Sequence, residues 1–265
     1  METRSSRPLI IGHRGAAGHA PENTLAAFSA ALALGVDAVE FDIQFTADGC
    51  PVVFHDETLK RMAGAACRIR DYPASILAGF DIGFLHGPEF RGERIPLVEE
   101  VAAAVPPHVG LHAELKDFDV VTSAHLARLF AAFEANGGLS RVTFSSPHEE
   151  TLDALRHALP TAKTALLLFR AVRVPTDAAR RAAYLGCVSV HPDVSLVSTD
   201  LVEICHRHGM KVFVFTVNER SAMRRLLPMG VDGFFTDYPD RLSETQPPTA
   251  PSPQLATEPP FGATP

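Results

Sequence analysis

The 265-residue sequence has no tryptophan, no apolar run as long as a membrane span, and no cysteine pair with CxxC spacing. A transmembrane helix needs about 20 consecutive apolar residues, so the sequence predicts no membrane anchor. The first ten residues, METRSSRPLI, lack the apolar segment of a secretory signal. The four cysteines, Cys50, Cys67, Cys187 and Cys205, are scattered, which is typical of reduced thiols. These absences predict a cytoplasmic protein.

Positive charge is also scarce, since 24 Lys and Arg stand against 31 Asp and Glu for a net charge of -7. A protein that binds nucleic acid through its phosphates needs a basic face, so no nucleic-acid partner is expected. A small phosphate substrate remains compatible with this charge, because a few local cations or one metal ion would be enough. The glycine-rich GxGxxG fingerprint of dinucleotide-binding sheets is absent as well.

Short apolar segments alternate with segments of helical periodicity, which is the pattern of buried parallel strands joined by helices. The strands are expected at 9–12, 36–43, 110–116, 141–145, 163–168, 187–190, 211–217 and 233–236. The first helix is expected to open at Pro21. The later helices are expected to cover 97–105, 120–136, 148–159, 176–185, 199–208 and 219–229. Eight such strands predict an α/β fold, the (β/α)8 TIM barrel, more strongly than an open sheet. We expect one domain over residues 8–243 and a disordered Pro-rich tail over 246–265.

Two segments interrupt this alternation. Asp48-Gly49 is a turn signal between the second strand and the apolar residues 51–54, so these residues should return antiparallel to that strand. Residues 57–95 then lose clean periodicity and are rich in glycine. We interpret them as an insertion after the second strand that covers the C-terminal face of the barrel.

Polar residues gather where the expected strands end, and in a TIM barrel catalysis takes place at the carboxyl ends of the strands. Because strand side chains alternate between faces, Glu40 and Asp42 should share one face, and Glu114 and Lys116 should do the same. Three carboxylates converging at the barrel mouth would repel one another unless a cation lies among them. Two explanations remain open: a hard divalent ion, Mg²⁺ or Ca²⁺, or a salt-bridge network with Lys116 and Arg14.

His13 and His55 are the candidate proton-transfer pair, because histidine titrates near neutral pH. Each could instead be an ordinary hydrogen-bonded residue at a strand end. Arg14 and Lys116 could balance the charge of a bound phosphate, or could simply neutralise the carboxylates.

These residues stand in a series of short motifs along the chain. The motifs are His13-Arg14-Gly15, Pro21-Glu22-Asn23-Thr24, Glu40-x-Asp42, Thr46-x-Asp48-Gly49, His55-Asp56, Glu114-x-Lys116, Thr216-Val217-Asn218 and Val231-Asp232-Gly233 with Thr236-Asp237. In this order they resemble the glycerophosphodiester phosphodiesterases, most of all the bacterial cytoplasmic members. The resemblance covers about residues 8–242 and includes the insertion.

The resemblance implies a TIM-barrel enzyme that hydrolyses glycerophosphodiesters to sn-glycerol 3-phosphate and an alcohol. It implies that Glu40, Asp42 and Glu114 are metal ligands and that His13 and His55 are the general acid and base. It also implies that Arg14 and Lys116 contact the substrate phosphate. One departure is Phe215, where the family often has tryptophan, so a hydrogen bond from an indole N–H is lost there.

The small-molecule substrate class has alternatives. The apolar residues Phe80, Phe84 and Phe90 of the insertion favour a second hypothesis, in which lysophospholipids are hydrolysed at the same site. A third hypothesis is a non-catalytic phosphate sensor on the same barrel, which would predict the loss of a catalytic or metal-binding residue. The sequence leaves open the oligomeric state, a homodimer included, and the roles of the two histidines.

Overall fold

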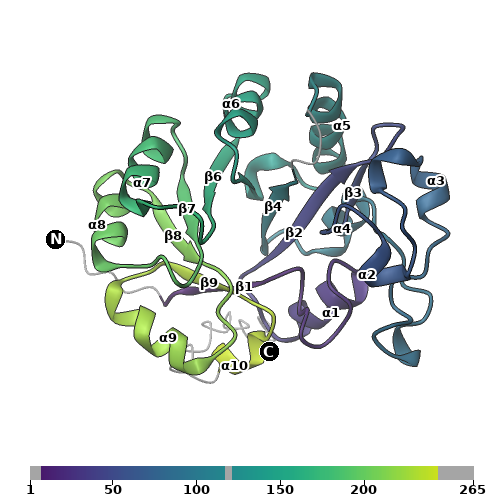
Figure 1. The fold of residues 1–265 in the computed structure, drawn as a ribbon, viewed down its shortest axis with the longest axis horizontal. Coiled ribbons are helices and arrows are strands. Elements are labelled where there is room, and N and C mark those ends of the chain that lie inside the picture. Colours follow the sequence, from purple (N-terminus) through teal and green to yellow (C-terminus); the bar gives the residue numbers. More distant parts are fainter. Residues whose placement is uncertain (1–6, 117–120, 244–265) are drawn as a thin grey trace, which may run out of the picture.

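The structure, a computed structural model, describes residues 7–116 and 121–243. Within these residues eight parallel strands form a closed barrel (Figure 1). They are β1 (Leu9–Gly12), β2 (Ala38–Phe45), β4 (Gly110–Leu115), β5 (Val142–Ser146), β6 (Lys163–Leu168), β7 (Ser189–Pro192), β8 (Lys211–Val214) and β9 (Gly233–Thr236). Strand β1 pairs with both β2 and β9, which closes the ring and confirms the predicted TIM barrel. The tail expected over 246–265 lies outside the described residues.

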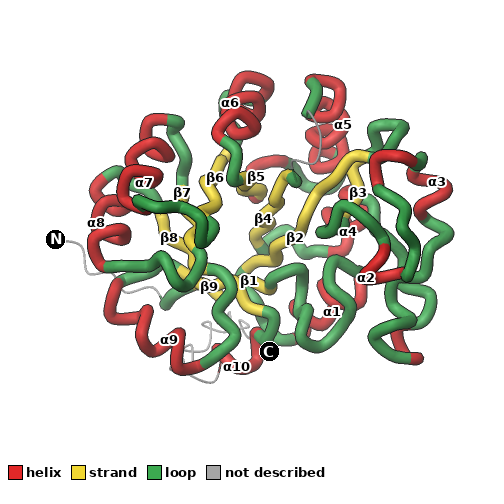
Figure 2. The backbone as a smooth tube through the Cα atoms, viewed as in Figure 1, coloured by secondary structure: helices red, strands yellow, loops and turns green. Residues whose placement is uncertain are grey.

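Helices surround the strands, as the colouring in Figure 2 makes plain. The helices of the repeated units are α1 (Leu25–Ala33), α4 (Val98–Ala104), α5 (Ser123–Glu134), α6 (Glu149–Ala158), α7 (Pro175–Tyr184), α8 (Thr199–Arg207) and α9 (Arg220–Leu226), and α10 (Pro239–Ser243) ends the described chain. Across residues 7–116 and 121–243, none of these helices combines the length and the hydropathy needed to cross a bilayer.

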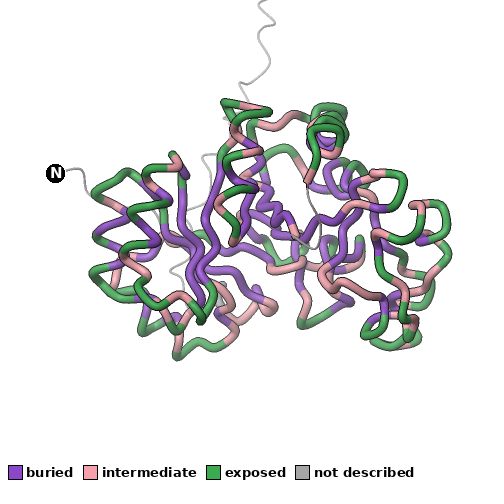
Figure 3. Tube along the Cα trace, turned by 45° about the horizontal axis from the view of Figure 1, so that its top comes forward, coloured by how far each residue is buried: buried purple, intermediate pink, exposed green. Residues whose placement is uncertain are grey.

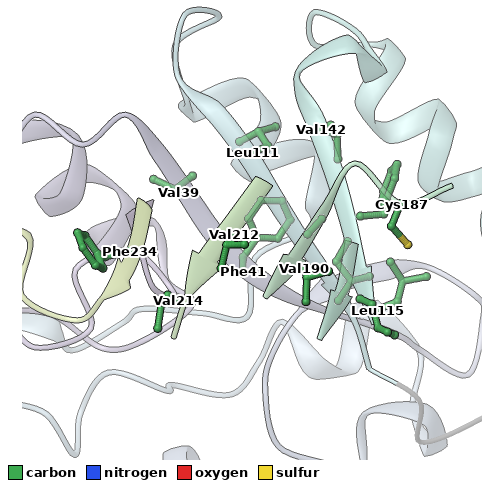
Figure 4. Packing of buried hydrophobic residues seen from close by; sticks show 14 of the residues in the cluster. Val39, Phe41, Leu111, Leu115, Val142, Cys187, Val190, Val212, Val214 and Phe234 are labelled. Carbon is green, nitrogen blue, oxygen red and sulfur yellow. The ribbon is translucent and has the colours of Figure 1, made fainter. Parts of the chain in front are cut away.

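The core lies between the strands and the helices, and most residues of the barrel strands are buried (Figure 3). Val39 and Phe41 of β2 point outward into this core (Figure 4), where the Phe41 ring packs edge-on against Phe28 of α1. Since strand side chains alternate, Glu40 and Asp42 of the same strand point into the barrel. The predicted assignment of faces is therefore confirmed for β2.

The first helix starts later than the sequence suggested. We expected it to open at Pro21, whereas α1 begins at Leu25 with Thr24 as its N-cap, whose Oγ1 accepts a hydrogen bond from the Ala27 amide. Asn23 has a φ of 59°, a left-handed conformation that cannot belong to an α-helix. The Asn23 amide donates instead to the carbonyl of Arg14, and this bond folds the preceding loop back onto β1.

The hairpin and the insertion form one packed unit. Strand β3 (Pro51–Val53) runs antiparallel to β2, as the Asp48-Gly49 turn predicted. The insertion carries the short helices α2 (Lys60–Ala63) and α3 (Ala74–Leu77) beside this hairpin (Figure 1). Their apolar side chains make a separate cluster that includes the hairpin residues Val52 and Phe54.

Two aspartates tie neighbouring strands together at the N-terminal end of the barrel. The sequence repeats Gly-Val-Asp at 35–37 and 230–232, in each case just before a strand. Asp37 Oδ2 accepts a hydrogen bond from the Ile10 amide at 2.8 Å, and Asp232 Oδ2 accepts one from the Val212 amide at 2.8 Å. The repeated motif thus performs the same structural task at two places in the ring.

Replacing Asp232 with asparagine should lower the free energy of unfolding by about 2 kcal/mol at pH 7, because the charge-assisted hydrogen bonds of a partly buried carboxylate are lost. Burial raises the pKa of Asp232, but hydrogen bonds from His206, Val212 and Lys211 outweigh it and lower the pKa overall. A carboxyl group whose folded-state pKa is depressed stabilises the fold above its unfolded pKa, and this contribution is lost as pH falls through the folded pKa.

Urea unfolding of the wild type and of D232N at several pH values measures this contribution. The difference in the free energy of unfolding between the two proteins should have its full value at pH 7 and should shrink below about pH 4. A difference that widens on acidification would contradict the assignment.

Candidate active site

Three carboxylates from two adjacent strands meet inside the C-terminal end of the barrel. Glu40 and Asp42 come from β2 and Glu114 comes from β4, and the register of these strands sets Asp42 directly beside Glu114. All three residues are buried, and each offers an oxygen within 4.8 Å of the others. The sequence-predicted triad is therefore one cluster.

Two cations partly neutralise this cluster. Lys116 Nζ lies 2.5 Å from Glu114 Oε1 and 2.9 Å from Asp42 Oδ1, while Arg14 Nε lies 3.2 Å from Asp42 Oδ2. Burial raises the pKa of Asp42, but Lys116 and Arg14 outweigh it and hold that pKa well below its usual range. The same carboxylates raise the pKa of Lys116 despite its burial, so it remains charged. The ion pairs of the salt-bridge alternative are thus present for Asp42 and Glu114.

Among the ion pairs of the described residues, neither the Lys116 nor the Arg14 side chain pairs with Glu40. Its Oε2 accepts the backbone amide of Arg14 at 2.9 Å, and His13 Nε2 lies 4.0 Å away. Burial and the nearby charge of Asp42 raise the pKa of Glu40 to about 7. Three buried carboxylates sharing two cationic side chains leave surplus negative charge, and an all-oxygen set of this kind fits a hard divalent cation.

His13 follows β1 and lies against the end of β9. Its Nδ1 is 2.7 Å from Oδ1 of Asp237, and the Asn218 amide group donates to the other Asp237 oxygen at 2.6 Å. Because a carboxylate only accepts hydrogen bonds, Nδ1 carries the proton and Nε2 is left facing the carboxylate cluster. Burial lowers the pKa of His13, but the bond to Asp237 and the charge of Glu40 outweigh it, and the pKa is raised.

His55 reaches the site from the hairpin. The Phe54 amide donates to the Asp42 carbonyl at 3.0 Å, which sets His55 beside the end of β2 as predicted. His55 Nδ1 lies 2.7 Å from Asp56 Oδ1, so Nε2 is again the free nitrogen. Burial and the charges of Lys116 and Arg14 outweigh the attraction of Asp42 and lower the pKa of His55.

The loop between β1 and α1 adopts strained backbone conformations at the site. Arg14 and Asn23 have φ angles of 52° and 59°, in the left-handed region that non-glycine residues seldom occupy. In this conformation, Asn23 Nδ2 lies 2.8 Å from Asp42 Oδ2, and Arg14 Nη1 lies 2.9 Å from Glu22 Oε1. Strain of this kind collects at functional sites because the surrounding contacts enforce it.

A cavity of about 230 Å³ opens beside the carboxylates and extends over the ends of the later strands. It is lined by His13, Arg14, Glu40, Glu114, Ser145, Leu167, Arg170, His191, Asp193, Val194, Phe215, Thr216 and Phe235. The ring of Phe215, at the position where tryptophan was expected, packs edge-on against the half-exposed Phe169 at 5.5 Å.

Several polar side chains near the site were not identified as functional from the sequence. Arg170 and Asp193 pair across the cavity wall, with Nε 3.1 Å from Oδ2. Arg61 of the insertion contacts Glu22 and Asp56. Arg170 lies two residues after the strand predicted over 163–168 and could have been found by that position, whereas nothing in the pattern of residues 57–95 marks Arg61.

Comparison with known proteins agrees with this geometry. The model of the glycerophosphoryl diester phosphodiesterase family matches residues 13–241. The chain belongs to this family. A glycerophosphodiester phosphodiesterase from Caldanaerobacter subterraneus subsp. tengcongensis is 34% identical, over 89% of this chain and 96% of that protein. This membership confirms the predicted enzyme class, a phosphoric diester hydrolase.

Two further relatives bear on the substrate. The structure of an Oleispira antarctica phosphodiesterase in complex with the product sn-glycerol-3-phosphate is 29% identical, with a TM-score of 0.82 over 89% of this chain and 96% of that one. A human lysophospholipase D is 28% identical, over 88% of this chain and 84% of that protein. The chain is thus similar in sequence both to a glycerophosphodiester phosphodiesterase and to a lysophospholipase D.

Proposed function

We propose that this enzyme hydrolyses glycerophosphodiesters to sn-glycerol 3-phosphate and an alcohol at the mouth of its barrel. The observation that carries the proposal is the buried cluster of Glu40, Asp42 and Glu114, with His13, Arg14 and Lys116 directly beside it. The product bound in the Oleispira antarctica relative supports the same substrate class.

The three carboxylates would hold a divalent ion, for which we propose Mg²⁺ or Ca²⁺ because all their donor atoms are oxygens. Such an ion, when bound, supplies Lewis-acid stabilisation of negative charge on the phosphodiester. Arg14 and Lys116 are proposed to attract the anionic phosphate to this position. Both remain cationic, since neighbouring carboxylates outweigh burial and raise the pKa of each.

His13 and His55 are proposed as the two proton-transfer groups. Each has its Nδ1 against an aspartate, at 2.7 Å in both cases, so each presents Nε2 for exchange with substrate. One histidine takes a proton from the attacking nucleophile, which is water or the glycerol 2-hydroxyl group, and the other gives a proton to the departing alkoxide. Asp237 and Asp56 hold the ring orientation and tautomer that this exchange needs.

The purified protein should release glycerol 3-phosphate from glycerophosphocholine, and EDTA should abolish the release. Adding Mg²⁺ or Ca²⁺ in excess of the chelator should restore it, and the ion that restores the higher kcat/KM identifies the preferred cofactor. Release of product that is unaffected by EDTA would contradict the metal dependence. No turnover of any glycerophosphodiester, together with tight binding of glycerol 3-phosphate, would favour the phosphate-sensor hypothesis.

A second substrate class, the lysophospholipids, is favoured by the half-exposed Phe169, whose ring packs against Phe215 of the cavity wall. These rings could contact an acyl chain as it leaves the cavity, and a human relative carries the name lysophospholipase D. A kcat/KM for lysophosphatidylcholine above that for glycerophosphocholine would establish this alternative.

We also propose a cytoplasmic location. It is supported by the four cysteines, which are all free thiols in the structure. Reduced thiols are the rule where glutathione and thioredoxin operate. Fractionation of cells that express the tagged chain tests this location.

A further inference from the structure

One side chain of the insertion, Arg61, joins two carboxylates that belong to different parts of the fold. Its Nε donates to Asp56 Oδ2 at 2.7 Å and its Nη2 donates to Asp56 Oδ1 at 2.9 Å. The same guanidinium donates to Glu22, from Nη1 to Oε2 at 2.9 Å and from Nη2 to Oε1 at 2.6 Å. Isolated surface ion pairs contribute little to stability, but a guanidinium that binds two carboxylates at once forms a network of defined geometry.

Each of the two carboxylates is bonded onward to a residue of the proposed catalytic machinery. Asp56 Oδ1 lies 2.7 Å from Nδ1 of His55, and Glu22 Oε1 accepts from Arg14 Nη1 at 2.9 Å. A single carboxylate side chain therefore links Arg61 to the proposed proton-transfer histidine, and another links it to the proposed phosphate-binding arginine.

The insertion holds the main chain of Arg61 firmly. Arg61 lies in the short helix α2, and both the N-cap residue Leu59 and the next residue, Met62, are buried in the cluster of the insertion. Phe54, the residue before His55, is buried in that same cluster. Arg61 and His55 consequently stand on one packed unit, made of the hairpin and the insertion.

Glu22, in contrast, belongs to the loop between β1 and α1 on the body of the barrel. The contact from Arg61 to Glu22 therefore fastens the unit that carries His55 to the loop that carries Arg14. Gln44 makes a second connection, since its Nε2 donates to the carbonyls of Phe54 and Asp56 at 2.8 Å each. That connection fixes the main chain around His55, but it leaves the ring to be oriented by the Asp56 carboxylate.

We propose that Arg61 is a positioning residue that orients His55 through Asp56 and sets its place relative to Arg14 through Glu22. This inference rests on the proposed function, because it assigns His55 a proton-transfer role. It also gives the insertion a catalytic purpose, which is to deliver one guanidinium to the junction of the two parts of the site. The expected cost of losing such an outer-shell contact is about 10- to 100-fold in rate.

Replacing Arg61 with glutamine tests this inference. For R61Q, kcat on glycerophosphocholine should fall about 10- to 100-fold with little change in KM, because misplacing a proton-transfer group affects the chemical step more than binding. R61K should be intermediate, since an ammonium cannot grip two carboxylates in bidentate fashion. R68Q is the matched control, because Arg68 is an equally exposed arginine of the insertion that pairs with Glu57 and leaves the site untouched. A kcat of R61Q equal to that of R68Q would overturn the inference.

A double-substitution cycle separates this role from a general structural one. If Arg61 acts through Asp56, the variant that combines R61Q with D56N should be about as slow as the slower single variant. Rate losses that multiply would show that Arg61 does not act through Asp56 and would overturn the proposal. Equal melting temperatures of R61K and wild type would establish that the lower rate is not caused by unfolding.

Ring ¹⁵N chemical shifts of His55 decide the inference even for an enzyme that does not turn over glycerophosphodiesters. In the wild type above neutral pH, the shifts should report a single tautomer with the proton on Nδ1. In R61Q they should report a mixture of tautomers, and an unchanged pattern would contradict the proposal. A wild type without turnover would refute the proposed function alone.

Discussion

The E40Q variant should lose about 10³-fold in kcat/KM for glycerophosphocholine, because an ion bound to the triad contributes several kcal/mol to the transition state. Glu40 is the most informative of the three proposed ligands to replace. Asp42 contacts Lys116, Arg14 and Asn23, so its removal would take a carboxylate partner from two largely buried cations at once. Glu40 accepts only a backbone amide among the hydrogen bonds of the described residues, and glutamine can still accept that bond.

Stability provides an independent signature of this variant. The raised pKa of Glu40 means that its ionised form destabilises the metal-free fold above about pH 4.3, the ordinary glutamate pKa. Metal-free E40Q should therefore melt at least as high as metal-free wild type at pH 8, while the rise in melting temperature on adding Mg²⁺ or Ca²⁺ should shrink.

D232N is the matched control for E40Q, because it removes a partly buried carboxylate that also accepts a backbone amide, at the opposite end of the barrel. It should lower stability and leave kcat/KM unchanged. Loss of stability without loss of activity in E40Q would show that Glu40 is not a metal ligand.

The second large effect is expected at the histidines. H13A and H55A should each lower kcat by about 10²- to 10⁴-fold, the range typical of losing a general acid or base. H208A is the control, because His208 is an exposed residue at the end of α8, outside the cavity lining. Activity in H13A or H55A equal to that of H208A would show that the substituted histidine transfers no proton.

The nature of the leaving group should reveal which histidine is the acid. A p-nitrophenyl ester of glycerol 3-phosphate departs as a stabilised phenolate and needs no proton from the enzyme. The variant that lost the general acid should regain most of its activity on this substrate, and the variant that lost the general base should stay slow. Recovery by both variants, or by neither, would contradict a division of the two roles between His13 and His55.

Much of the candidate site was predictable because a strand has a period of two. That period assigned Glu40 and Asp42 to one face of β2 and Glu114 to the corresponding face of β4, and the structure brings all three together. The turn signal at Asp48-Gly49 likewise predicted that His55 would arrive by an antiparallel return. Both are local properties of the chain, and local backbone geometry follows from local sequence.

Element boundaries were less predictable where capping decides them. The helix expected from residue 120 begins at Ser123, because Thr122 Oγ1 accepts the amide of His125 and acts as its N-cap. The motif Pro21-Glu22-Asn23-Thr24 suggested a helix start at its proline, but its first residues form the strained loop that brings Asn23 to Asp42. A strained conformation persists only when distant contacts compensate for it, and a sequence does not display those contacts.

The sequence alone determined the eight repeated units, the family resemblance and the polar residues at the strand ends. All of these depend on periodicity and short motifs, which are local properties of the chain. Only the tertiary structure decided which of these residues are partners. His13 meets Asp237 across a sequence separation of 224 residues because β1 closes the barrel against β9. Arg61 meets Glu22 because α2, at the start of the insertion, packs with the hairpin into one unit. Contacts of this kind depend on ring closure and on packing between separate units, and both are properties of the folded chain as a whole.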